Sequence, residues 1–153
     1  MQRRMFLRGT IATGAAGIAA SAGLLTPQAV LAAWPEGAFG ATDVKSAMSA
    51  IAGGDSPEAG EIKIKAPDIA ENGAVVPITV STKMEGVESI SILASKNGTP
   101  LIASFNLGEN AEAFASTRIK MGKTADVVAL VKADGKLYSA KKEVKVTIGG
   151  CGG

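Results

Sequence analysis

The last five residues of the chain, Gly149-Gly150-Cys151-Gly152-Gly153, hold its single cysteine, and the chain has no histidine. A thiolate is a strong nucleophile and forms disulfide-like bonds with other sulfur atoms. Glycine has no Cβ and restricts the backbone least. The four glycines around the thiol therefore predict a thin, flexible C-terminal arm (residues 149–153) that enters a narrow cleft of another protein. The alternative is a frayed terminus whose cysteine has no role.

No other catalytic chemistry is indicated by the sequence. Without histidine the chain offers no imidazole base or ligand, and one cysteine cannot build a thiolate metal site. Asp126, Asp134 and Glu143 have ordinary surface spacing in or beside predicted strands, and we interpret them as solvated. We therefore predict no catalytic residue, no metal site and no cofactor, which leaves Cys151 as the nucleophile.

Three lysines lie close to the arm in the sequence: Lys141, Lys142 and Lys145. Positive charges there would favour anionic groups near the thiol. Most lysine clusters are simply solvated surface, so the anion-binding role is a hypothesis, with a solvated face as its alternative.

The first 32 residues resemble an export signal. Arg3, Arg4 and Arg8 precede a weakly apolar stretch, and residues 30–32 end it with the small-x-Ala pattern of a processing site. An arginine pair followed by Phe-Leu and a basic residue is typical of a twin-arginine signal. We predict cleavage after Ala32, export to the periplasm by the twin-arginine route, and no membrane contact after processing. An interfacial anchor helix that stays attached is the alternative.

The charge of the remaining chain argues against a nucleic-acid partner. The whole chain has 16 lysines and arginines against 14 acidic residues, and three of the arginines lie in residues 1–32. Residues 33–153 therefore carry 13 basic and 14 acidic side chains, with no basic excess for a phosphate backbone. The length suffices for one small domain, and a single cysteine excludes internal disulfides, so apolar packing must stabilise the fold.

A short amphipathic helix is predicted from Thr42 onward. Thr42 is a suitable N-cap, Asp43 would lie in the first turn, and Gly53-Gly54 would end the helix. Its apolar face consists of Val44, Ala47, Met48 and Ile51. A helix of about ten residues is unstable alone, so it must pack, on its own domain by preference or else on a partner subunit. The preceding residues 33–37 are predicted to be extended.

From Glu61 onward the apolar period changes to two, which is typical of strands. The seven predicted strands are Glu61–Ala66, Ala74–Ser81, Val87–Ala94, Leu101–Leu107, Ala113–Met121, Ala125–Ala133 and Lys136–Ile148. Pro77 cannot donate to a ladder, so its position should face an edge or a bulge. The strand from Ala125 is almost wholly apolar, as in a central strand covered on both faces, and Asp134-Gly135 predicts a two-residue hairpin. In the fourth strand the odd-numbered residues are expected to face inward.

Seven short strands without helical crossovers predict an all-β fold. We expect an immunoglobulin-like antiparallel β-sandwich with a short N-terminal helix and a flexible C-terminal arm. The predicted divisions are a signal peptide (1–32), an N-terminal segment with the helix (33–60), the sandwich (61–148) and the arm (149–153). The last strand would give the arm a rigid base.

Four segments are similar to those of one known family: the terminal pentapeptide and residues 72–80, 116–119 and 143–148. The chain resembles SoxY, the sulfur-carrier subunit of the bacterial thiosulfate-oxidising Sox system. The resemblance implies a carrier rather than an enzyme, with sulfur intermediates held covalently on the thiol of Cys151. It also implies a heterodimer with a SoxZ-like subunit. The partner enzymes it implies are a c-type cytochrome complex that loads thiosulfate, a manganese hydrolase that releases sulfate, and a sulfane dehydrogenase.

Two other functions remain open. A terminal Gly-Gly also occurs in ubiquitin-like sulfur carriers, whose C-terminal carboxylate becomes a thiocarboxylate after adenylation. Those proteins work where ATP is present, and an export signal argues against them. An exported structural or interaction module would use Cys151 only for an intermolecular disulfide, as in a disulfide-linked dimer.

Overall fold

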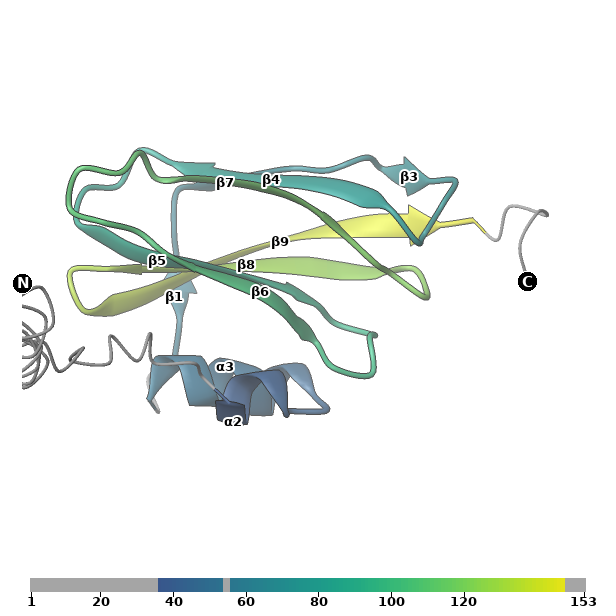
Figure 1. The fold of residues 1–153 in the computed structure, drawn as a ribbon, viewed down its shortest axis with the longest axis horizontal. Helices are drawn as coiled ribbons and strands as arrows, with labels where there is room; N and C mark the ends of the chain where they lie inside the picture. The colour runs from purple at the N-terminus through teal and green to yellow at the C-terminus, as the bar shows by residue number, and fades with distance from the viewer. Residues whose placement is uncertain (1–35, 54–55, 148–153) are drawn as a thin grey trace, which may run out of the picture. The chain divides into compact units, whose positions relative to one another are not determined.

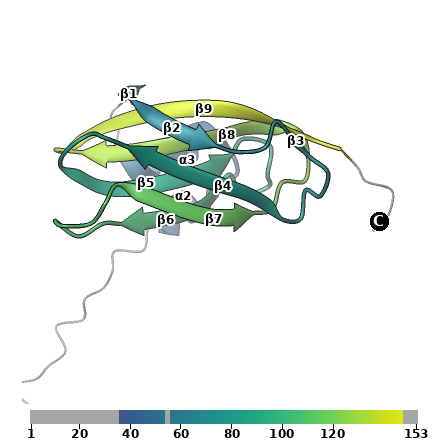
Figure 2. The same ribbon diagram turned by 90° about the horizontal axis from the view of Figure 1, so that it is seen from above.

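The computed structural model describes residues 36–53 and 56–147, which all belong to one compact unit. The elements follow in the order α2 (Glu36–Phe39), α3 (Val44–Ala52), β1 (Glu58–Ala59), β2 (Ile62–Lys65), β3 (Ile69–Ala70), β4 (Val76–Thr82), β5 (Val87–Ala94), β6 (Leu101–Asn106), β7 (Phe114–Ile119), β8 (Ala125–Ala133) and β9 (Lys136–Val146). The larger sheet has the order β1-β9-β8-β5-β6, with β3 also paired to β9, and the smaller has the order β2-β4-β7. Figures 1 and 2 show the smaller sheet over one face of the larger and both helices over the other. The predicted β-sandwich with a short helix is confirmed.

The main core lies between the two sheets. Its fully buried members include Val76, Ile78 and Val80 of β4, Ile90 and Ile92 of β5, and Val127, Ala129 and Val131 of β8. They occupy every second position because successive side chains of a strand point to opposite faces. Nearly all of them are aliphatic, as a chain with 4% aromatic residues requires.

A second core lies between the larger sheet and the helices. It buries Ala38 and Ala47 of the helices against Leu93, Leu101, Leu130 and Leu137 of the strands. Strand β8 contributes to both cores, so the predicted central strand covered on both faces is confirmed. The helix packs on its own domain, which answers the question that the sequence left open. No helix in the two described ranges is long and apolar enough to cross a membrane.

The ends of the helices differ in part from the prediction. Asp43, not Thr42, is the N-cap of α3: its backbone is extended (φ −135°, ψ 154°), and its carboxylate accepts a hydrogen bond from the Ser46 amide at 2.9 Å. The Ser46 hydroxyl also donates to Asp43, and these bonds, the hydroxyl's first, lower the pKa of that carboxyl. Gly53, with φ 66°, ends α3 as expected. Residues 36 and 37, predicted to be extended, belong to α2.

The sheets contain features that the apolar pattern does not predict. Strands β1 and β3 have two residues each and pair in parallel with β9, so the sandwich is not wholly antiparallel. The register between β5 and β6 shifts at Ile92/Leu93. This irregularity places Leu101 in the core on the helix side, whereas Phe105 and Leu107 pack in the core between the sheets. The expectation that odd-numbered residues of this strand share one face is therefore wrong at Leu101.

Pro77 lies in β4, which is the central strand of the smaller sheet. Strand β2 pairs with β4 only as far as Thr79, so it does not reach Pro77. On the other side Pro77 stands opposite Arg118. Thr82 donates its amide to the Ala113 carbonyl at 3.1 Å, and the alternation of an antiparallel ladder then makes the Pro77–Arg118 pair a non-hydrogen-bonded one. The missing N–H of Pro77 therefore removes no ladder bond.

The turn between β8 and β9 is the predicted two-residue hairpin. Asp134 and Gly135 both have positive φ, 48° and 73°, and the flanking residues Ala133 and Lys136 are paired. These dihedral angles are those of a type I′ turn, for which Asp-Gly is a preferred sequence because glycine adopts positive φ without steric cost.

Gly73 makes a close approach between the loop after β3 and the end of β9. A Cβ at Gly73 would clash with the carbonyl oxygen of Met121 and lie 2.8 Å from Cγ1 of Val146. The Met121 amide also donates to the Gly73 carbonyl at 2.7 Å, so the two backbones are fixed together.

We predict that Gly73→Ala lowers the free energy of unfolding by about 1–3 kcal/mol, the usual cost of overpacking, because a backbone carbonyl cannot easily move aside. Gly122→Ala is the matched control, since a Cβ there would have no neighbour within 4 Å. The control should change the free energy by less than about 0.5 kcal/mol. Urea unfolding of the two variants measures the difference, and equal midpoints would contradict the prediction.

Candidate functional site

Cys151 and the four glycines Gly149, Gly150, Gly152 and Gly153 lie outside the described residues, as do Arg3 and Arg4. The described part of the candidate site is therefore the end of β9 and Thr147, which follows it. Four residues of fully extended chain span about 14 Å at most. A residue four positions beyond Thr147 therefore cannot lie farther from it than this distance.

The end of β9 is held from several sides. Ile69 and Ala70 of β3 pair in parallel with Lys145 and Val146. The amide of Val146 donates to Oγ1 of Thr124 at 2.9 Å, and the amide of Thr147 donates to the Ala70 carbonyl at 3.1 Å. The predicted rigid base is thus present up to Thr147. Sequence patterns did not indicate Thr124 or β3, because a single hydroxyl and a two-residue strand carry no periodicity.

The three lysines near the arm do not form one free basic group. Nζ of Lys142 donates to the Ala66 carbonyl at 2.7 Å and lies 3.0 Å from Oδ1 of Asp68. Lys142 therefore fastens β9 to the loop before β3, which favours a structural role for this residue over the anion-binding hypothesis. Lys141 and Lys145 are exposed, but the exposed Glu143 lies between them in the strand and shares their face.

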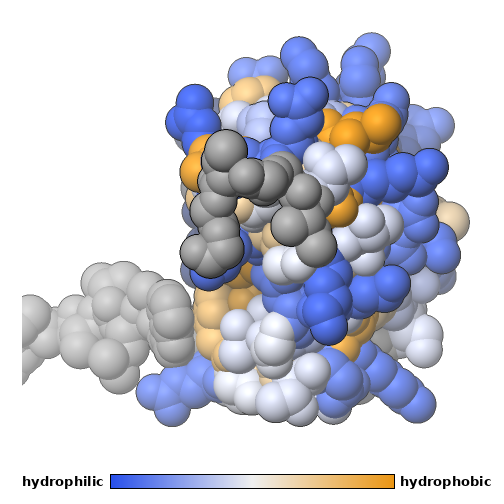
Figure 3. Space-filling model, turned by 90° about the vertical axis from the view of Figure 1, so that its right-hand side faces the viewer, coloured by the Kyte–Doolittle hydropathy of each residue, from blue (hydrophilic) through white to orange (hydrophobic). Residues whose placement is uncertain are grey.

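The end of the sandwich where β9 finishes is largely hydrophilic. Figure 3 looks onto this end and shows hydrophilic side chains over most of the described surface, with hydrophobic residues in small separate patches. Beside this end, Ile69 of β3 is 57% exposed and Val75, in the loop after β3, is 49% exposed. In the described residues no three Cys, His, Asp or Glu side chains are grouped so that they could hold a metal ion.

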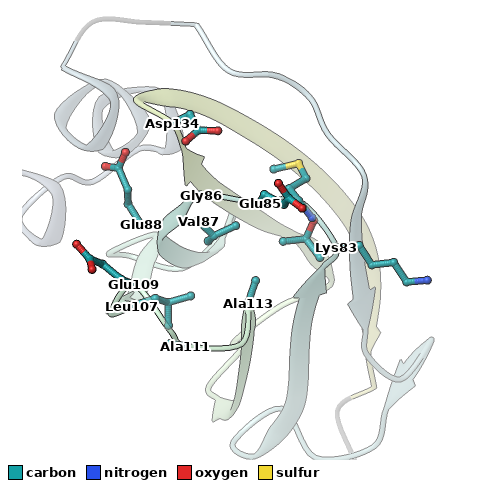
Figure 4. A pocket seen from close by; sticks show the side chains of 12 residues that line it. Lys83, Glu85, Gly86, Val87, Glu88, Leu107, Glu109, Ala111, Ala113 and Asp134 are labelled. Atoms are coloured by element: carbon teal, nitrogen blue, oxygen red, sulfur yellow. The ribbon is translucent and has the colours of Figure 1, made fainter.

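A cavity of about 640 Å³ lies at the opposite end of the sandwich. Figure 4 shows four carboxylates around it, and Lys83 pointing away from them. The carboxylates belong to Glu85, Glu88, Glu109 and Asp134, and the apolar lining comes from Met84, Val87, Leu107, Ala111 and Ala113. The cavity includes the turn before β9, and the 11 residues of this strand span roughly 35 Å. It is therefore beyond the reach of Cys151 of the same chain.

One carboxylate of the cavity, that of Glu88, has structural partners. Glu88 accepts a hydrogen bond from the Gly135 amide at 2.9 Å and lies 3.3 Å from Nζ of Lys132. These contacts, the Gly135 bond first, lower the pKa of Glu88. Asp134, interpreted from the sequence as solvated, is exposed in the hairpin turn. Asp126 is half-buried in β8: its amide donates to the Ser95 hydroxyl at 3.1 Å, and its carbonyl accepts from the Ser95 amide at 2.9 Å.

A family model and a solved structure support both the fold and the family. No curated protein sequence matches the chain at a significant level. The structure of the sulfur carrier protein SoxY from Chlorobium limicola f thiosulfatophilum is 45% identical, with a TM-score of 0.62, over 69% of this chain and 97% of that chain. A superoxide reductase (neelaredoxin) from Ignicoccus hospitalis is 20% identical, with a TM-score of 0.52, over 59% of this chain and 82% of that chain. At this identity the similarity concerns the fold alone.

The family model described as sulfur oxidation protein SoxY matches residues 48–151. The match begins in α3, includes every strand of both sheets, and ends at Cys151. This chain therefore belongs to the SoxY family.

Proposed function

We propose that this chain is a periplasmic carrier that holds sulfur intermediates covalently on the thiol of Cys151 during thiosulfate oxidation. The observation that carries the proposal is the extent of the family match, which continues past β9 to the single cysteine of the chain. The solved relative, described as a sulfur carrier protein, supports the same role. The fixed end of β9 supports it further, because the chain leaves the sandwich at one defined point.

The chemistry needs one nucleophile and electron acceptors on other proteins. When the thiolate of Cys151 joins the outer sulfur of thiosulfate, one S–S bond forms and two electrons leave, for which we propose a c-type cytochrome complex as acceptor. Water then attacks the sulfonate sulfur, the S–S bond to it breaks, sulfate departs, and a persulfide stays on Cys151. No electrons are exchanged in this hydrolysis, which we assign to a manganese hydrolase. A sulfane dehydrogenase would oxidise the remaining sulfur.

The carrier itself needs no active site in this scheme, because each partner supplies one. We propose a SoxZ-like subunit as the stable partner in a heterodimer. A small sandwich with exposed strand edges and two half-exposed aliphatic residues beside its arm-bearing end is a reasonable subunit of such an assembly. The rival role, a structural module joined to a second molecule by a Cys151 disulfide, uses the same residue but no sulfur chemistry.

We predict that Cys151→Ser abolishes growth and respiration on thiosulfate, because no other thiol exists in the chain. The urea midpoint of the domain should stay unchanged, since the buried residues of both described cores lie between Ala38 and Val144. As a matched control, Ser49→Cys added to Cys151→Ser restores one exposed thiol on α3 and should not restore growth. Normal oxygen uptake with thiosulfate in the Cys151→Ser strain would refute the carrier role.

Replacing Gly150 and Gly152 with valine separates the reactivity of the thiol from its access to partners. β-Branched side chains widen the arm and restrict its backbone, so loading by the cytochrome complex should fall at least tenfold. Labelling by a small thiol reagent should change less than twofold. Equal slowing of both rates would mean that the glycines tune the thiol. If neither rate changes, a thin arm is not required.

The export route has its own test. Arg3→Lys combined with Arg4→Lys keeps the charge but removes the arginine pair that the twin-arginine route requires. We expect the precursor to accumulate in the cytoplasm and the periplasmic pool to fall at least tenfold. Immunoblots of cell fractions measure both, with Arg8→Lys as control. A normal amount of processed protein in the periplasm would exclude this route.

A further inference from the structure

The chain contains two Asn-Gly pairs, Asn72-Gly73 and Asn97-Gly98, and both lie among the described residues. An asparagine before glycine is chemically labile. The backbone nitrogen of the next residue can attack the side-chain amide, and glycine has no Cβ that obstructs the attack. The rate depends on how tightly the folded chain holds the asparagine, and the two pairs differ in this respect.

Asn97 is held at both polar atoms of its side chain. Nδ2 donates to the Lys120 carbonyl at 2.7 Å, and Oδ1 accepts from the Gly122 amide at 3.4 Å. The residue is also half-buried. Rotation of this side chain toward the Gly98 nitrogen would break both hydrogen bonds and take a partner from the Lys120 carbonyl. The structure therefore protects the second pair.

Asn72 is exposed and is held at one polar atom only. Oδ1 accepts a hydrogen bond from the Ala74 amide at 2.9 Å, which makes an Asx turn. Within residues 36–53 and 56–147, Nδ2 of Asn72 and the Gly73 amide have no hydrogen-bond partner. The leaving nitrogen and the attacking nitrogen are therefore both available, and solvent reaches the side chain.

The hydrogen bond from Ala74 also favours the attack. When the Gly73 nitrogen adds to Cγ of Asn72, negative charge develops on Oδ1, the atom that accepts from the Ala74 amide. A donor directed at the oxygen on which charge develops stabilises the transition state. At Asn97 the shorter bond is made instead by the leaving nitrogen, which the Lys120 carbonyl holds in place.

We propose that Asn72 is a site of spontaneous deamidation, a covalent modification of the folded chain that needs only water and a base. The Gly73 nitrogen loses its proton to the base and attacks Cγ of Asn72. A C–N bond forms, the Cγ–Nδ2 bond breaks, and the departing nitrogen takes up a proton and leaves as ammonia. Water then opens the succinimide ring at either carbonyl, which gives aspartate or isoaspartate. No electrons are exchanged, and the proposal does not depend on the sulfur chemistry of Cys151.

The modification would act on the end of β9. Isoaspartate adds one methylene carbon to the main chain between positions 72 and 73. Gly73 has no room to shift, because a Cβ on it would clash with the Met121 carbonyl oxygen and lie 2.8 Å from Cγ1 of Val146. The Met121 amide also donates to the Gly73 carbonyl at 2.7 Å. Deamidation of Asn72 should therefore loosen the contact between this loop and the end of β9.

The test follows the full chain during storage in mildly alkaline buffer. Peptide mapping by mass spectrometry measures aspartate and isoaspartate at positions 72 and 97 over time. The same chain unfolded in urea is the reference, because both Asn-Gly pairs are then exposed to solvent. Asn72→Gln is the matched variant: it keeps the amide but lengthens the side chain by one methylene group, so the succinimide ring cannot form.

In the folded chain we expect Asn72 to deamidate at least tenfold faster than Asn97, whereas in urea the two rates should be similar. Storage should speed hydrogen exchange of the Met121 amide at least tenfold and leave the Leu107 amide, at the opposite end of the sandwich, unchanged. Stored Asn72→Gln should show no faster exchange at Met121.

Equal rates at Asn72 and Asn97 in the folded chain would overturn the proposal. So would an unmodified Asn72 in folded chain when the sample in urea has reacted. Unchanged exchange at Met121 in the deamidated chain would overturn the inferred effect on β9. If Asn72→Gln does not fold, the two rates in the unsubstituted chain decide.

Discussion

Strand β9 is paired with β8 from the hairpin turn to Val144, and the rest of the structure depends on this pairing. Residues 125–133 stand one-to-one opposite residues 136–144 without a register shift. Strand β8 contributes to both cores, so the pair is held on two faces at once. Beyond Val144, β3 and the hydroxyl of Thr124 replace β8 as partners. The chain is therefore fixed up to Thr147.

The residues that stabilise the fold are distinct from the terminal residues to which we assign the proposed chemistry. Both cores are built mainly from aliphatic side chains of the described strands and helices. In the proposed carrier role, loading and release at the end of the chain would leave the buried apolar surface of these cores unchanged. Lys142 likewise contributes to the stability of the sandwich, because its ammonium group joins β9 to the loop at Asp68.

The sequence predicts those parts of the fold in which local chemistry and burial agree. The limits of β8, the Asp134-Gly135 turn and the glycine end of α3 are such cases. It does not predict β1 and β3, because a two-residue parallel strand depends on where β9 lies in space. Leu101 is misassigned because the irregularity opposite Ile92 and Leu93 is a property of two strands together.

The sequence also predicts only part of the candidate site. Elimination of other nucleophiles predicts Cys151 from the sequence alone, since it is the single thiol of a chain that lacks histidine, and this stays a prediction because Cys151 lies outside the described residues. The function of the lysines could not be predicted, because Lys142 is bound by Ala66 and Asp68, which lie some 75 residues earlier in the chain. The prediction of Thr42 as the N-cap of α3 is wrong because the cap depends on the backbone geometry that brings the Ser46 amide to the Asp43 carboxylate.

The central claim is that sulfur intermediates are bound covalently to Cys151. Intact-mass and peptide mass spectrometry of the chain from cells that oxidise thiosulfate tests it most directly, with cells grown without thiosulfate as reference. We predict a thiosulfate or persulfide adduct that is confined to the peptide containing Cys151 and is released by a thiol reductant. An unmodified thiol, a Cys151–Cys151 disulfide as the sole product, or a modified carboxyl at Gly153 would contradict the claim.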